Sequence, residues 1–168
     1  MEHELCVDDR TVALEIATAD TLADALRQAG ETQVKVACAR GECGSCTVLV
    51  AGTAVHACGV LACMVTGPVT TAASADDAVV AVREAFADAG AFQCGFCTPG
   101  MVARAAALVA SEVPFDDHRL RHELAGNVCR CTGYVQILRA IRAAWNRRHG
   151  GTADATTTPS EPAEGFTR

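Results

Sequence analysis

The chain has 168 residues, half of them apolar, and a formal net charge of -6 at pH 7. That length allows one domain or two small ones with a sizeable core, and the acidic balance argues against nucleic acid as the main partner. The first residues lack the basic-then-apolar layout of a secretory signal, and no stretch approaches the roughly 20 apolar residues of a membrane span. We therefore expect a soluble, cytoplasmic protein without a membrane partner.

Residues 1–73 have the pattern of a small mixed β-sheet with one helix. Short apolar runs bounded by turn residues predict four strands, at about residues 5–7, 12–16, 47–50 and 53–57. Thr21 and Asp24 have the spacing of a capping box, so a helix is expected to begin there and to end near Gly30.

Residues 74–149 change to helical periods. Four helices are expected to begin near residues 75, 98, 116 and 134. Ser74 is the expected cap of the first helix, and Pro99 suits the first turn of the second. Four helices with short connections predict a bundle, so the fold class is α+β. Residues 150–168 are rich in Thr, Pro, Ser, Glu and Gly, which predicts a disordered tail.

Ten cysteines in one chain need an explanation. An extracellular disulfide framework is one interpretation, but the missing export signal and the tight clustering both weaken it. Metal binding accounts for them better. Eight of the cysteines divide into two sets of four, which are Cys38, Cys43, Cys46 and Cys58, and Cys94, Cys97, Cys129 and Cys131.

The first set begins with the motif CARGECGSC at residues 38–46. Its C-x4-C-x2-C spacing is that of plant-type ferredoxins, and Cys58 supplies a fourth thiolate at a distance. Gly41 and Gly44 can adopt positive φ and let amides approach the sulfurs, where they would stabilise the negative charge of a cluster. Tetrahedral zinc also accepts four thiolates, but zinc sites more often show paired C-x2-C knuckles.

The second set is split between two loops, QCGFCTPG after the first predicted bundle helix and GNVCRCTGY before the last. In a bundle these loops can meet at one end and bring four thiolates together. Taken alone, Cys94 and Cys97 also resemble a thioredoxin redox pair, but that interpretation leaves Cys129 and Cys131 without a role. Zinc remains the main alternative here, and no paired histidine pattern indicates a Rieske site.

The segments CARGECGSCTV, the later Cys58, QCGFCTPGM and GNVCRCTGY, in this order and spacing, resemble the small iron-sulfur subunit of molybdenum hydroxylases, the xanthine dehydrogenase and carbon monoxide dehydrogenase family. The resemblance covers roughly residues 3–145. It implies a ferredoxin-like β-grasp domain over residues 1–73 and a four-helix domain over residues 74–149, each with one [2Fe-2S] cluster on the four cysteines assigned to it above.

The same resemblance implies partners. The cluster of the helical domain would face the molybdopterin cofactor of a separate large subunit. Gln93 matches the family's glutamine that contacts the pterin, and Cys131 matches the ligand nearest to it. The other cluster would lead to FAD on a medium subunit, within a hetero-oligomer such as a dimer of heterotrimers.

The remaining candidates receive no functional role. Cys63 lies close enough to Cys58 in sequence to compete as a ligand, but the resemblance favours Cys58, and Cys63 and Cys6 are then expected to be buried thiols. His118 and His122 stand at i, i+4 on a predicted helix, where a solvated surface is the commoner role.

The sequence offers no acid-base pair or activated nucleophile for substrate chemistry, so we expect electron transfer within an oxidoreductase complex. Two other hypotheses are a zinc-stabilised interaction protein and a stand-alone ferredoxin. Purines, other N-heterocycles, aldehydes, carbon monoxide and aromatic thioesters all stay open as substrates of the complex, because the pocket that selects among them would lie on another chain.

Overall fold

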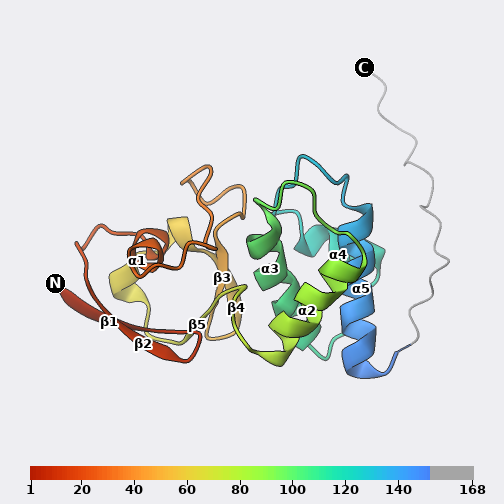
Figure 1. Cartoon of the computed structure of the whole chain (residues 1–168), viewed down its shortest axis with the longest axis horizontal. Coiled ribbons are helices and arrows are strands. Elements are labelled where there is room, and N and C mark those ends of the chain that lie inside the picture. Colours follow the sequence, from red (N-terminus) through yellow and green to blue (C-terminus); the bar gives the residue numbers. More distant parts are fainter. Residues whose placement is uncertain (152–168) are drawn as a thin grey trace, which may run out of the picture.

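Figure 1 shows an α+β structure, in which a sheet and the helix α1 form one half and α2 to α5 form the other. The computed structural model describes residues 1–151. The disordered tail predicted for residues 150–168 therefore falls, except for its first two residues, outside the described part of the chain. Within residues 1–151 no helix is both long and apolar enough to cross a bilayer.

Five strands form one sheet in the order β2-β1-β5-β3-β4. They are β1 (Glu2–Val7), β2 (Arg10–Glu15), β3 (Thr47–Val50), β4 (Thr53–His56) and β5 (Val69–Thr70). Strand β1 runs antiparallel to β2 and parallel to β5, while β3 is antiparallel to both β4 and β5. The four predicted strands are confirmed. The sequence does not predict β5, because two residues are too few to show a period.

Local sequence explains the first hairpin and α1. Asp8 and Asp9 have φ values of 47° and 63°, the left-handed conformation that aspartate tolerates, and they form the turn from β1 to β2. Helix α1 (Leu22–Gln28) has the predicted capping box: Thr21 Oγ1 accepts from the Asp24 amide at 3.2 Å, and Asp24 Oδ2 accepts from the Thr21 amide at 3.1 Å. Its buried residues share a hydrophobic core with the sheet.

The four predicted helices of the second half are present. They are α2 (Asp77–Asp88), α3 (Thr98–Ala110), α4 (Asp117–Glu123) and α5 (Val135–His149). The predicted cap of α2 is wrong. Asp76, not Ser74, accepts hydrogen bonds from the first free amides of the helix, and the Ser74 hydroxyl instead accepts from the Asp76 amide. Aspartate and serine cap about equally well, so the sequence alone does not choose between them.

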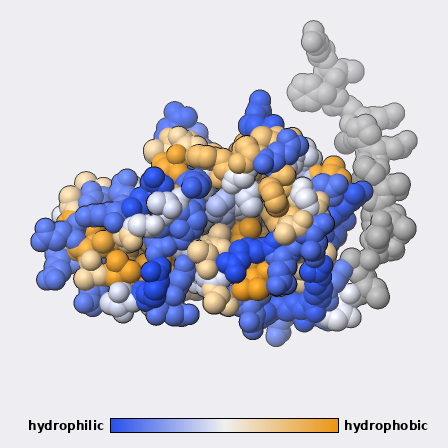
Figure 2. Space-filling view, viewed as in Figure 1, coloured by the Kyte–Doolittle hydropathy of each residue, from blue (hydrophilic) through white to orange (hydrophobic). Residues whose placement is uncertain are grey.

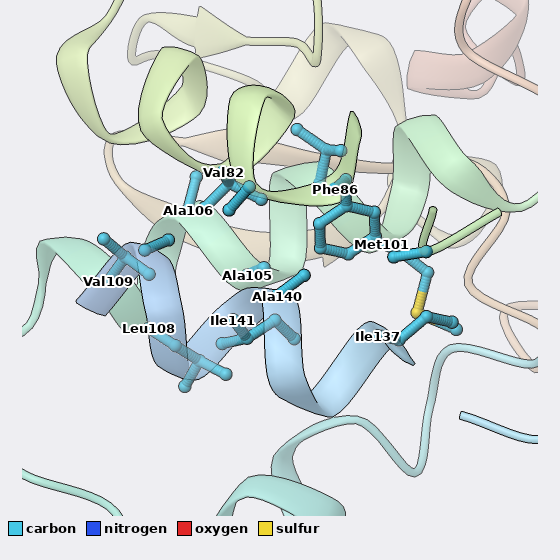
Figure 3. Packing of buried hydrophobic residues seen from close by; sticks show 14 of the residues in the cluster. Val82, Phe86, Met101, Ala105, Ala106, Leu108, Val109, Ile137, Ala140 and Ile141 are labelled. Carbon is cyan, nitrogen blue, oxygen red and sulfur yellow. The ribbon is translucent and has the colours of Figure 1, made fainter. Parts of the chain in front are cut away.

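Helix α3 is the centre of the helical half. It packs against α2 and α5, and Figure 3 shows Phe86, Met101, Ile137 and Ile141 of these three helices in one cluster. Helix α3 also packs against β3 and β4, and Leu49 of β3 is buried in the same cluster. The two halves are therefore in direct contact, with the loops that carry the cysteines close to their junction.

Candidate metal centres

Residues 38–46 form a tight loop before β3, in which backbone amides point at cysteine sulfurs. The Arg40 amide lies 3.5 Å from Cys38 Sγ, and the Gly41 amide lies 3.2 Å from Cys58 Sγ. Gly41 has the predicted positive φ, of 73°. Amides that donate to sulfur favour its charged form, so this loop is built to hold thiolates.

The four cysteines of the first set meet as two pairs. Cys43 lies next to Cys38, and Cys58 lies next to Cys46, each close enough to shift the pKa of its neighbour. The Cys58 amide also donates to Cys46 Sγ at 3.4 Å. Cys46 and Cys58 are buried, whereas Cys38 and Cys43 are half-buried. The fold thus brings together a loop and the short 3₁₀ turn Ala57–Gly59, which supplies Cys58.

These thiols differ in acidity. The backbone N–H of Arg40 lowers the pKa of Cys38 to about 6, and amides of Cys43 and Glu42 add to the effect. Burial raises the pKa of Cys46 to about 11. Metal ligation requires thiolates. Because burial disfavours the thiolate of Cys46, a bound cation would have to stabilise that negative charge.

The second set lies at the beginnings of α3 and α5, as predicted. It also forms two pairs: Cys131 Sγ lies 3.7 Å from Cys94 Sγ, and Cys97 lies next to Cys129, which contributes to the raised pKa of Cys97. Cys129 is buried and Cys97 is half-buried, whereas Cys94 and Cys131 are exposed. One pair therefore opens to the surface and the other faces the interior.

Acidity in the second set follows burial and local hydrogen bonds. Burial raises the pKa of Cys97 to about 12. Burial also acts to raise the pKa of Cys129, but hydrogen bonds from the Thr132 hydroxyl and from the amides of Cys131 and Thr132 together outweigh it, and the net direction is down. Thr132 Oγ1 lies 3.2 Å from Cys129 Sγ. The side-chain hydrogen bond with Cys94 raises the pKa of Cys131.

The arrangement in pairs bears on which metal group fits. In the part of the chain that the structure describes, no three Cys, His, Asp or Glu side chains gather closely enough to hold one metal ion. The eight cysteines meet two by two instead. A [2Fe-2S] cluster takes two protein ligands on each of its two irons, so two pairs of thiolates are the donor set that it requires.

Asn127 and Tyr134, in the loop of the second set, make contacts that the sequence does not reveal. The Tyr134 hydroxyl accepts a hydrogen bond from the Cys129 amide at 2.7 Å and donates one to the Asn127 carbonyl at 3.0 Å. Tyr134 also has a left-handed φ of 68° at the start of α5. Both residues stand in the GNVCRCTGY motif, but their residue types do not indicate which groups they contact.

Gln93 and Cys131, which the resemblance places next to a pterin, lie side by side. Gln93 Nε2 donates to the Cys131 carbonyl at 3.2 Å, and both residues are exposed. This contact joins the loop before α3 to the loop before α5.

The cysteines and histidines that were given no functional role match their expected exposure only in part. Cys6 is exposed, so the prediction of a buried thiol is wrong: Leu5 and Val7 face the core, and strand alternation turns Cys6 outward. Cys63 is half-buried, with its thiol 3.7 Å from the Thr18 carbonyl. His118 and His122 of α4 are both exposed, as predicted.

Comparison with known protein families divides the chain between two cluster-binding models. Residues 6–67 match the 2Fe-2S iron-sulfur cluster binding domain, and residues 69–142 match the [2Fe-2S] binding domain. A relative from Escherichia coli O157:H7, the xanthine dehydrogenase iron-sulfur-binding subunit, is 43% identical over 71% of this chain and 79% of its own length. The nicotinate dehydrogenase small FeS subunit of Eubacterium barkeri is 40% identical over 75% and 83%.

Solved structures of oxidoreductases also resemble this chain. The chain resembles part of quinoline 2-oxidoreductase from Pseudomonas putida 86 with a TM-score of 0.80 and 34% identity, over 90% of this chain and 97% of that one. It also matches the aldehyde oxidoreductase of Desulfovibrio desulfuricans ATCC 27774, with a TM-score of 0.79 and 34% identity, over 89% of this chain but only 17% of that longer one.

Proposed function

This chain belongs to the family of [2Fe-2S] iron-sulfur subunits of molybdenum hydroxylases, and on that basis we propose that it is the electron-transfer subunit of such a complex. It would receive electrons from a molybdopterin centre on a large subunit and deliver them to FAD on a medium subunit. When bound, each cluster would supply a one-electron carrier.

The proposed ligands follow the cysteine pairs. In the first centre, Cys38 and Cys43 would hold one iron, and Cys46 and Cys58 the other. In the second centre, the two irons would be held by Cys94 with Cys131 and by Cys97 with Cys129. The first centre would belong to a ferredoxin-like β-grasp domain over residues 1–73, and the second to a four-helix domain over residues 74–149.

One hydrogen bond carries the proposal of a relay. The carbonyl oxygen of Cys43, a proposed ligand of the first centre, accepts from the Val128 amide at 2.9 Å. Val128 directly precedes Cys129, a proposed ligand of the second centre. Ligands of the two centres are thus connected by covalent bonds and a single hydrogen bond, with no solvent gap to cross.

The second centre also has the surface that a partner subunit needs. Cys94 and Cys131 are exposed, and so are three large apolar residues beside the proposed ligands, Phe92, Phe96 and Val128. In Figure 2 apolar residues interrupt the hydrophilic surface along the upper edge of the molecule, where the loops of Figure 1 lie. We propose that the large subunit covers this surface, with Gln93 and Cys131 nearest to the pterin, in a cytoplasmic hetero-oligomer such as a dimer of heterotrimers.

The test is to purify the chain with its natural partners under anaerobic conditions. We expect it to bring down a molybdenum subunit and a flavin subunit in stoichiometric amounts, and to contain iron and inorganic sulfide but no zinc. Colourless protein with two zinc ions would contradict the proposal and favour an interaction protein. Red-brown protein without partners would indicate a stand-alone ferredoxin.

A further inference from the structure

The junction between the two halves of the chain centres on one buried side chain, Asn127. Its exposed fraction is 3%, and its Nδ2 donates to three groups: Gly44 O at 2.9 Å, Thr47 Oγ1 at 3.0 Å and Gly100 O at 3.3 Å. Thr47 Oγ1 itself donates to Gly44 O at 2.7 Å. One amide group therefore ties the first cysteine loop, β3 and the first turn of α3 to the loop before α5.

Around Asn127 the backbones approach closely. A Cβ atom on Gly44 would lie 2.3 Å from Gly126 O, and one on Gly100 would lie 2.2 Å from Gly44 O. These distances are too short for any side chain, so the junction is made by backbone against backbone. Its spacing then depends on the groups that bridge it.

The main chain of Asn127 is tied to the second set of cysteines. Its carbonyl accepts from the Tyr134 hydroxyl, and that hydroxyl accepts from the Cys129 amide. The next residue, Val128, donates to Cys43 O. Asn127 thus holds the loop of the first set through its side chain and the loop of the second set through its carbonyl.

We propose that Asn127 is a positioning residue, which fixes the separation of the two cluster loops and with it the hydrogen bond between Cys43 and Val128. This inference rests on the function proposed above. All three groups that face Nδ2 are acceptors, so the position calls for a donor, and Gly44 O accepts from the Thr47 hydroxyl as well. An aspartate would place acceptors against acceptors, and a leucine would leave the three buried acceptors without this donor.

The junction has room to move once this bridge is lost. A cavity of about 210 Å³ lies beside it, lined in part by Thr47, His56, Arg104 and Asn127. We therefore expect loss of the amide to let the loops separate while each cluster stays on its own four cysteines.

The test compares Asn127→Leu with the unmodified holo-protein by electron paramagnetic resonance after full reduction. The magnetic interaction between two paramagnetic clusters falls steeply with their separation. We expect the splitting or relaxation broadening that one cluster causes in the other to be weakened in Asn127→Leu, with iron content and the g-values of each cluster unchanged. The matched control is Asn146→Leu near the end of α5, which should keep the interaction.

An unchanged interaction in Asn127→Leu with both clusters present would overturn the inference, and so would unmodified protein whose clusters show no interaction. If Asn127→Leu does not fold, Thr47→Val decides instead, because it keeps the side-chain shape and removes the contact with Asn127 Nδ2 together with the hydrogen bond to Gly44 O: a weakened interaction supports the inference and an unchanged one overturns it. Failure of the proposed function is a different result, in which the unmodified protein contains no clusters.

Discussion

Tyr134 illustrates how one side chain organises the second cysteine loop. Its hydroxyl satisfies a backbone donor, the Cys129 amide, and a backbone acceptor, the Asn127 carbonyl. The loop between these residues carries two of the eight cysteines. The hydroxyl therefore fixes the loop before any metal contributes.

We expect Tyr134→Phe to destabilise the protein by about 1–3 kcal/mol, because two backbone groups lose their partner. The variant should also release iron from the second centre sooner on heating than the unmodified protein. Thermal unfolding and loss of visible absorption measure the two effects.

The control for Tyr134 is Trp145→Phe, which loses the hydrogen bond from Nε1 to Ser111 O on the other side of the helical half. It should lower the unfolding temperature without early release of iron. Equal iron release by the two variants would show that the Tyr134 hydroxyl has no special role in holding the loop.

At the scale of elements, the sequence predicts most of the fold because its local signals agree. The capping box at Thr21, Pro99 in the first turn of α3 and the periodic apolar residues all match the structure. Strand β5 and the cap of α2 are not predicted correctly, the first because it is too short and the second because Ser74 and Asp76 are both good caps.

The sequence predicts which cysteines make up each candidate site, but it does not predict the contacts among them or with their neighbours. Spacing groups eight cysteines into two sets, and the structure brings the members of each set together in pairs. The spacing does not reveal which cysteines pair within a set. It also does not reveal the bridge that Asn127 makes to Gly44, a residue 83 positions earlier in the chain. Contacts over such separations depend on how the two halves pack, which no local pattern encodes.

A substitution at Gly100 tests how closely α3 packs against the first cysteine loop. Alanine normally favours a helix over glycine by about 1 kcal/mol, so propensity alone predicts that Gly100→Ala stabilises α3. The new Cβ would lie 2.2 Å from the Gly44 carbonyl oxygen, and backbone cannot give way cheaply. We expect a net destabilisation of about 1–3 kcal/mol, measured by denaturant unfolding.

The matched control is Gly126→Ala in the same junction, where the nearest contact of a Cβ is the His56 ring at an ordinary 3.5 Å. It should change the free energy of unfolding by less than Gly100→Ala does. A Gly100→Ala variant as stable as the unmodified protein would contradict the close approach of α3 to the first loop.

At the scale of the whole molecule, the two sets of cysteines differ in what surrounds them. The second set presents Cys94 and Cys131 to the surface, whereas the first set keeps Cys46 and Cys58 buried against the sheet. Between the sets lies the hydrogen bond from Val128 to Cys43. The relay proposed above requires this arrangement, in which one cysteine pair is exposed at the surface and the two loops are linked inside the chain.

The most direct measurement is electron paramagnetic resonance of the dithionite-reduced holo-protein, made alongside Cys46→Ser and Cys97→Ser. We expect two [2Fe-2S] signals in the unmodified chain, loss or alteration of one signal in Cys46→Ser, and loss or alteration of the other in Cys97→Ser. A single signal, or one signal that both substitutions remove, would contradict two separate centres.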